Sequence, residues 1–302
     1  MATLAGTAAP AASAAGPGRL TRFFRYARRN PAFGIGLIIL ITLVLFSTVG
    51  MLFIDLRKAP YPLGTPPSKP PSWQYPFGTD AQGRNLIAVM IVGTQLTLRV
   101  GLMAGAIGIA VGTILGFVSA YYGGFLDGVV KWIVDVMLTI PAFLILVVIA
   151  STLRNFLTVE SMALIIAVLA WVGPTRMIRA QVLTLRERQF VLMARLSGMN
   201  NIEIMFKELL PNVLPYLLAG FVQSVTAAIL TALGLELLGL GSQREPTLGM
   251  TIYWVQKYSA ILRGLWWWWT IPVIIIVLLV VSLALISLGL DEWSNPRTRR
   301  AA

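Results

Sequence analysis

Long apolar runs separated by shorter polar segments dominate the chain. The first run, 31–54, follows directly on a group of arginines between residues 19 and 29. A helix needs roughly 20 apolar residues to cross the hydrocarbon of a bilayer. Five more runs of suitable length predict helices near 96–121, 128–150, 161–179, 213–235 and 269–290. The pattern therefore predicts an all-α polytopic membrane protein with six transmembrane helices.

The polar segments predict the parts outside the bilayer. Residues 1–30 begin with Ala, Gly, Pro, Ser and Thr and end in arginines, which predicts a disordered, basic tail. The segment 55–95 starts with many prolines and predicts an extended loop. The core of the protein is expected over 96–290, and a second tail over 291–302. The run 31–54 exceeds the roughly 7–15 apolar residues of a signal peptide, so we expect a retained span.

The distribution of basic residues predicts the orientation. With charges at span edges assigned to the nearer side, 15 of the 24 Lys and Arg residues fall on the side that holds both termini and nine on the other. Cytoplasmic segments of membrane proteins are enriched in Lys and Arg. We therefore expect both termini, and the loop 186–212 between the fourth and fifth spans, in the cytoplasm.

Composition agrees with this fold class. The chain is 57% hydrophobic and 12% charged, whereas soluble domains average about 45–50% apolar and about 25% charged residues. The net charge of +12 follows from the predicted topology, so no nucleic-acid partner is expected. The absence of His and Cys removes the usual metal ligands, a His base and a Cys nucleophile. No catalytic or metal site is therefore predicted in this chain.

A membrane enzyme is a poor alternative. A serine protease with a His base is excluded because the chain has no His. An aspartyl enzyme needs two carboxylates that share a site, and only Asp135 lies well inside a predicted span.

Charged residues inside spans are candidates for function. Lys131 and Asp135 stand one helical turn apart in the third predicted span and are possible residues of a translocation pathway. Two alternatives are a local ion pair and a Lys131 side chain that extends to the interface. Pro141 predicts a kink in the same span. Arg176 and Arg179 are interpreted as marking the cytoplasmic end of the fourth span.

The second predicted span carries small residues on one face. Its glycines are spaced by three and four residues: Gly101, Gly105, Gly108, Gly112 and Gly116. Helices in lipid associate through small residues that let their backbones approach closely, so this face predicts helix packing. The sequence has no G-x-x-x-x-G-K-[ST] run. If ATP drives the protein, another polypeptide binds it.

Four consecutive tryptophans, 266–269, open the last span. Tryptophans gather where membrane and water meet, and we interpret the group as an interfacial anchor. A cation-binding cage is the alternative.

The loop 186–212 predicts two short amphipathic helices. The first includes apolar residues of 190–196 and can end at Gly198 in a left-handed cap. The second covers 202–210 and is expected to stop at Pro211. Such a loop suits docking in a groove of another protein. A helix on the membrane surface would show the same pattern, and the residues alone leave both alternatives open.

This loop resembles the EAA loop of ABC-importer permeases, whose pattern is E-A-A-x-x-x-G-x9-I-x-L-P. Matching positions are Ala194, Gly198, Leu210 and Pro211. The chain departs from the pattern at Leu192 for the glutamate, Met193 for the first alanine and Glu208 for the isoleucine.

Other segments resemble the peptide and nickel branch of this family, especially the C-subunit group of dipeptide and oligopeptide permeases. FGTDAQGRN at 77–85 is similar to the branch's FGTDxxGRD segment. Similar patterns occur at 116–141 (G-x-x-x-G-Y-x-G-G-x-x-D), 232–252 (A-L-x-F-L-G-L-G, then P-x-x-G-x-M) and 267–272 (W-W-x-x-x-x-P). The resemblance covers about residues 20–298.

The resemblance implies a subunit of an importer in the cytoplasmic membrane of a prokaryote. Its implied partners are a homologous second permease, two ATPase subunits that bind ATP and Mg²⁺, and an extracytoplasmic binding protein. It implies that the loop contacts an ATPase subunit through Leu192, Met193, Ala194, Arg195, Gly198, Leu210 and Pro211. Peptides are the expected substrate. Nickel or another small solute is the alternative, and a membrane scaffold or sensor is the alternative from another class.

Overall fold

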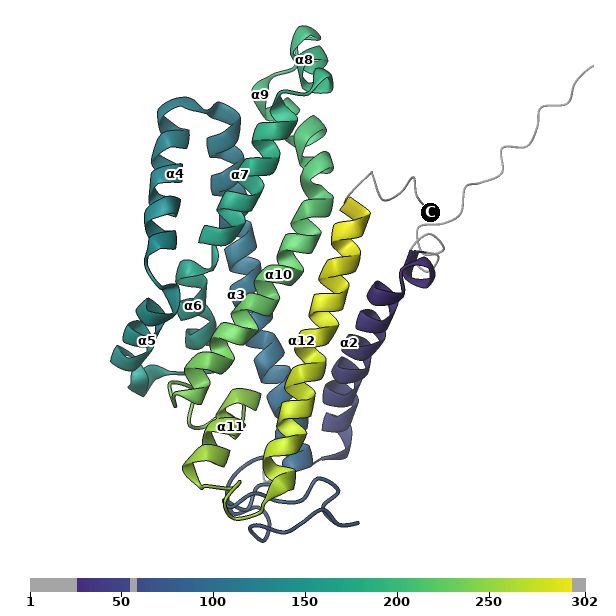
Figure 1. Ribbon diagram of the computed structural model, residues 1–302, viewed down its shortest axis with the longest axis vertical. Coiled ribbons are helices and arrows are strands. Elements are labelled where there is room, and N and C mark those ends of the chain that lie inside the picture. The colour runs from purple at the N-terminus through teal and green to yellow at the C-terminus, as the bar shows by residue number, and fades with distance from the viewer. Residues whose placement is uncertain (1–25, 55–58, 295–302) are drawn as a thin grey trace, which may run out of the picture.

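The computed structural model describes residues 26–54 and 59–294 (Figure 1). This part of the chain is helical and contains no strand, with one isolated bridge between Thr79 and Asn85. The all-α prediction is therefore confirmed. The predicted tails fall mostly outside the described residues.

Four helices within 26–54 and 59–294 are long and apolar enough to cross a membrane. The first is α2 (Pro31–Gly50) with the 3-10 turn η1 (Met51–Phe53). The others are α3 (Leu86–Tyr122), α10 (Leu210–Leu237) with the turns before it, and α12 (Trp266–Ser294). Two bent pairs would raise the number to six: α4 (Gly124–Thr139) with α5 (Ala142–Thr152), and α6 (Val159–Ala170) with α7 (Val172–Arg186).

Helix α3 begins ten residues before the predicted span, so the loop outside the helices ends at Asn85. The Asn85 side chain accepts a hydrogen bond from the Ile87 N–H and caps the helix. Leu86, Val89 and Met90 are fully buried. The early start therefore reflects packing against other elements of the protein.

Prolines mark both breaks. The α4–α5 pair bends by 78°, and Ile140 between the two helices is extended, as expected of a residue before proline. Pro141 caps α5. The α6–α7 pair bends by 42°, and Pro174 lies in the first turn of α7, where proline is tolerated because the first helical N–H groups need no partner within the helix.

The predicted stop at Pro211 is wrong. A continuous helix covers Asn201–Leu237, in which α9 (Asn201–Glu203) and the π-helical segment η3 (Ile204–Leu209) lead into α10. Pro211 lies in the first turn of α10. The π turn bonds the Leu210 N–H to the Met205 carbonyl, and the Asn212 amide donates to the Glu208 carbonyl at 2.7 Å. Proline has no N–H to donate to a carbonyl of the preceding turn. The two bonds satisfy neighbouring carbonyls of that turn, those of Met205 and Glu208, and the helix continues through Pro211.

Helix α3 lies at the centre and contacts α2, α6, α7 and α10 (Figure 1). Its five predicted packing glycines are buried. A Cβ at Gly105 would lie 2.8 Å from the backbone of Val225 in α10. At Gly112, a Cβ would lie 2.8 Å from the carbonyl oxygen of Trp171. Along this face, α3 approaches α10 first and then α6 and α7, backbone against backbone.

Gly105→Leu is expected to destabilise the fold. The new side chain meets the backbone of α10, which cannot move aside as a flexible side chain would, and overpacking of this kind costs about 1–3 kcal/mol. The measurement is the midpoint of thermal unfolding in detergent, followed by size-exclusion chromatography. Ala110→Leu adds the same leucine at an exposed position of the same helix and should leave the midpoint unchanged. Equal midpoints for both variants would contradict the packing role.

The interfacial-anchor interpretation is wrong for two of the four tryptophans. Trp267 and Trp268 are buried, while Trp266 and Trp269 are exposed. The Trp267 indole donates to the Thr79 carbonyl at 3.1 Å. The middle pair therefore packs α12 against the loop that precedes α3.

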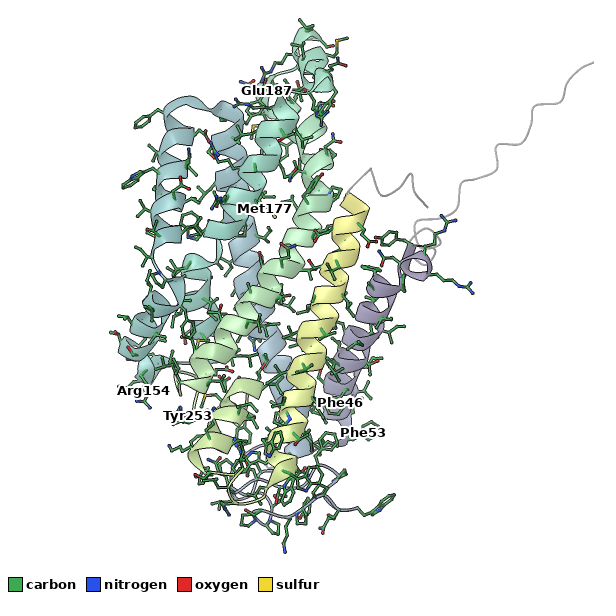
Figure 2. The ribbon with its side chains drawn as sticks, in the orientation of Figure 1. Phe46, Phe53, Arg154, Met177, Glu187 and Tyr253 are labelled. Carbon is green, nitrogen blue, oxygen red and sulfur yellow. The ribbon has the colours of Figure 1, made fainter. Side chains whose placement is uncertain are left out.

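The bundle has two different ends (Figure 1). One end holds the short helix α8 (Gln189–Leu196), the beginning of α2 and the end of α12. The other holds the loop before α3 and the helix α11 (Leu248–Lys257). Figure 2 shows Glu187 at the α8 end, and Arg154 and Tyr253 toward the opposite one.

Candidate functional site

The helix α8 has one face against its own chain and one face exposed. Val191 and Ala194 are buried in a cluster that includes Ile178 of α7 and Ile204. On the outer face, 57% of Leu192, 62% of Met193 and 74% of Leu196 remain exposed. The fold thus presents an apolar surface, defined here as the α8 face (Leu192, Met193, Leu196), at the tip of the bundle.

The turn after α8 is built around Gly198, whose φ is +81°. The Met199 N–H returns to the Ala194 carbonyl at 3.2 Å, which closes the helix with a left-handed glycine. The next helix starts with a capping box, in which the Asn200 side chain accepts from the Glu203 N–H at 2.8 Å. Both helix ends are thereby fixed by local bonds.

Side-chain contacts tie this turn to the end of α3. The Arg195 guanidinium lies 5.9 Å from the ring centroid of Tyr121, and the Tyr121 hydroxyl donates to Asn201 at 2.9 Å. At the neighbouring residue of α3, the Ala120 carbonyl accepts a hydrogen bond from Arg186 of α7 at 2.6 Å. The tip is therefore held against α3 as well as against α7.

The predicted coupling residues do not all lie on one surface. Leu192, Met193 and Arg195 are exposed, whereas Ala194 is buried beneath them. Leu210 is half-buried, and Pro211 is exposed in the first turn of α10. The arrangement divides them into residues that present a surface and residues that hold it in place.

A second group of polar residues lies between α4 and α7. A cavity of about 220 Å³ is lined by Lys131, Val134, Asp135, Thr175, Arg176 and Arg179. Arg179 makes a two-pronged ion pair with Asp127 at the start of α4, at 2.6 and 2.7 Å. Pro141 does not line this cavity.

One interpretation of the charged residues needs correction. Lys131 and Asp135 form no ion pair with each other within 4 Å, and both side chains are exposed at the cavity. Helix α7 continues past Arg176 and Arg179 to Arg186, and their place at the cytoplasmic end of the fourth span stays a prediction. An unbroken helical pattern after Arg179 was the signal that could have placed both arginines inside α7.

The sequence did not predict that Asp80 and Arg84 form a buried ion pair with a structural role. In the segment 77–85, the Asp80 side chain is fully buried and the Arg84 side chain is 5% exposed, and they form an ion pair at 2.5 Å. Asp80 also accepts from the backbone N–H groups of Gln82 and Arg84, each at 2.8 Å. The resemblance of this segment to a family motif thus corresponds to a closed loop stabilised by one carboxylate.

Metal ligation finds no support among the described residues, in which no group of three or more His, Cys, Asp or Glu side chains is placed to hold a metal ion.

Comparisons with known proteins extend these observations. The family of binding-protein-dependent transport system inner membrane components matches residues 108–300. The dipeptide transport system permease protein DppC of Bacillus subtilis (strain 168) is 30% identical over 277 residues, which cover 92% of this chain and 85% of that protein.

Two further relatives align over less of their length. DppC of Alkalihalophilus pseudofirmus is 30% identical over 222 residues, 73% of this chain and 71% of that protein. The oligopeptide transport system permease protein OppC of Mycobacterium bovis is 30% identical over 175 residues. The chain spans 60% of the length of this mycobacterial relative.

The family match and the apolar helices give the same location, the cytoplasmic membrane, which the chain crosses several times. With a family match over residues 108–300 and a relative aligned over nearly the whole chain, this protein belongs to the binding-protein-dependent transport system inner membrane components.

Proposed function

We propose that this chain is a permease subunit of an ATP-driven ABC importer for peptides. The exposed α8 face carries the proposal, because an apolar surface at the tip of a membrane bundle needs a protein groove or a lipid surface to cover it. Helix α8 projects beyond the ends of its neighbours (Figure 1), which favours a protein groove. We assign this groove to an ATPase subunit.

In this arrangement each bent pair forms one span, which gives six spans with both termini in the cytoplasm. The common end of α2, α8 and α12 is then the cytoplasmic end. The partners are a homologous second permease, two ATPase subunits and an extracytoplasmic binding protein. The chain itself binds no ATP and carries out no reaction, so hydrolysis takes place on the ATPase subunits.

Motion would pass from the ATPases to the spans through the contacts of the tip. Ala194 and Val191 pack on α7, and Tyr121 joins the turn to α3. Leu210 and Pro211 continue directly into α10. Displacement of α8 would thus move three helices together, which is what a change between inward- and outward-facing states requires.

The translocation pathway is proposed to follow α4, α5 and α7. Lys131 and Asp135 border the polar cavity, and Pro141 separates the two halves of the bent third span. Charged side chains inside membrane proteins usually face a water-filled route or other polar groups, which supports this placement.

Peptides are the proposed substrate because the relatives described above are named as dipeptide and oligopeptide permeases. The test is uptake of labelled dialanine, a longer peptide and nickel in a strain that lacks this gene, with and without the gene restored. Restored peptide uptake alone supports the proposal. Restored nickel uptake would favour the small-solute alternative, and no restored uptake of any kind would favour a scaffold or sensor.

The variant Leu192→Glu/Leu196→Glu tests the α8 face. Two charges in place of apolar contacts should prevent ATPase subunits from binding, and loss of the central contacts of an interface typically costs at least about 2 kcal/mol each. The measurement is co-purification of the ATPase subunits from detergent extracts. Leu262→Glu adds a charge at a leucine that is 89% exposed, in the loop before α12 and far from α8, and should leave co-purification intact. Normal co-purification of the double variant would contradict the assignment of this face.

A further inference from the structure

The polar cavity between α4 and α7 holds both signs of charge. It is lined by Lys131 and Asp135 of α4 and by Arg176 and Arg179 of α7. Arg179 already has its partner in Asp127. Among the described residues, no oppositely charged group lies within 4 Å of Lys131, Asp135 or Arg176. Two cations and one anion at the cavity therefore have no direct ion-pair partner.

These residues lie deep along their helices. Arg186 of α7 is level with the last turn of α3, because it donates to the Ala120 carbonyl. Arg176 precedes Arg186 by ten residues, which is about 15 Å along the helix at the usual rise per residue. Asp135 follows the start of α4 at Gly124 by eleven residues, or about 16 Å.

The three charges need a polar neighbour. A charge in contact with lipid chains costs several kcal/mol, and charged side chains within membrane proteins usually face a water-filled route or other polar groups. A polar solute that enters the cavity has matching chemistry, because it can supply both signs of charge.

The spacing of the charges indicates a small zwitterion. Lys131 and Asp135 are one turn apart, a separation of about 6 Å between their Cβ atoms. A dipeptide spans two residues of at most about 3.6 Å each between its ammonium and carboxylate ends. The cavity volume, about 220 Å³, is below the roughly 300–1,000 Å³ of sites for larger ligands.

We propose that this cavity binds the two charged ends of a dipeptide. Lys131 and Arg176 hold the carboxylate, and Asp135 accepts hydrogen bonds from the ammonium group. The assignment adds Arg176 to the residues of the pathway and rests on the proposed function as a peptide permease. Because the cavity recognises the termini, it accepts different side chains and discriminates against peptides whose ends are blocked.

Saturation-transfer NMR tests the proposal on the purified complex of this chain with its partner permease and ATPase subunits, without the binding protein. The probes are dialanine, dialanine amide and N-acetyl-dialanine. Dialanine should bind about tenfold more tightly than either blocked peptide. Each block removes one charge-assisted hydrogen bond, and the loss of such a bond weakens binding by about this factor. Arg176→Gln should remove the preference over the amide, and Asp135→Asn the preference over the acetylated peptide.

Two controls separate a binding role from a structural one. Arg176→Lys keeps the charge and should keep the preference for the free carboxylate. Arg99→Gln removes a positive charge from a surface ion pair with Glu160 and should change neither preference. Preferences that persist in Arg176→Gln and Asp135→Asn would overturn the proposal, as would equal binding of all three probes by the unmodified complex.

Uptake measurements separate a failure of the dipeptide site from a failure of the proposed function. ATP-driven uptake of dialanine by the unmodified complex, reconstituted in vesicles with the binding protein, tests the proposed function. Uptake without discrimination at the cavity overturns only the dipeptide site. Failure of uptake for every peptide tried overturns the proposed function and the dipeptide site with it.

Discussion

Replacing Gly198 with aspartate is expected to abolish ATP-driven transport while the permease still assembles in the membrane. Gly198 has a φ of +81°, a conformation that costs other L-residues roughly 1–2 kcal/mol. This cost is smaller than the about 5–15 kcal/mol that stabilises a typical fold. A Cβ at this position would meet no atom of the chain within 4 Å. A complete loss of transport would therefore come from a partner that contacts the turn.

The measurement is ATP-driven uptake by reconstituted complexes, together with the ATPase activity that loaded binding protein stimulates. Gly264→Asp is a matched control, because Gly264 has a φ of +71° and equally open surroundings but lies in the loop before α12. It should leave ATP-driven uptake and the stimulated ATPase activity unchanged. Normal transport by Gly198→Asp would show that the turn after α8 does not couple to an ATPase.

Replacing Asp80 with asparagine is expected to destabilise the loop before α3 by about 3–5 kcal/mol, the usual cost of removing one partner from a buried ion pair. The substitution keeps the size of the side chain and removes its charge. Arg84 would then stay buried opposite an amide that cannot neutralise it. The same loop contacts Trp267 through Thr79, so its loss should also loosen the start of α12.

Thermal unfolding in detergent and proteolysis of the loop measure this effect. Glu203→Gln removes a carboxylate from the exposed pair with Lys207, which has the same spacing along the chain, and should leave the unfolding temperature unchanged. Recovery of stability in Asp80→Asn/Arg84→Leu would show that the unpaired arginine causes the loss. An unchanged unfolding temperature in Asp80→Asn would contradict the role of the buried pair.

Local signals predicted much of this fold because they act within a few residues. Apolar runs located the helices, and Pro141 located the sharpest bend, since proline restricts the residue before it wherever it occurs. The glycine spacing identified the face of α3 that is buried. The short helix before Gly198 followed from its alternation of apolar and polar residues.

The errors arose where distant contacts outweigh local preference. Pro211 would end an isolated helix, but a π turn and the Asn212 side chain accommodate it. Trp267 and Trp268 have the composition of an interfacial belt, yet they are buried in a cluster with Leu86, far away in the sequence. The Trp267 indole also donates to the Thr79 carbonyl. The cavity at Arg176 required knowledge of which face of α7 meets α4, and spacing along one helix does not contain it.

The glycine face of α3 also bears on how the bundle can change shape. Gly101 and Gly105 meet α10, whereas Gly108 meets α6, and Gly112 and Gly116 meet α7. Different neighbours therefore pack on the same face of α3 at different positions along its axis. Glycine has no side chain, so at these positions α3 contributes no rotamer that must change when a neighbouring helix shifts. We therefore expect α10 to rotate about α3 relative to the α6–α7 pair without changes of α3 side chains at this face.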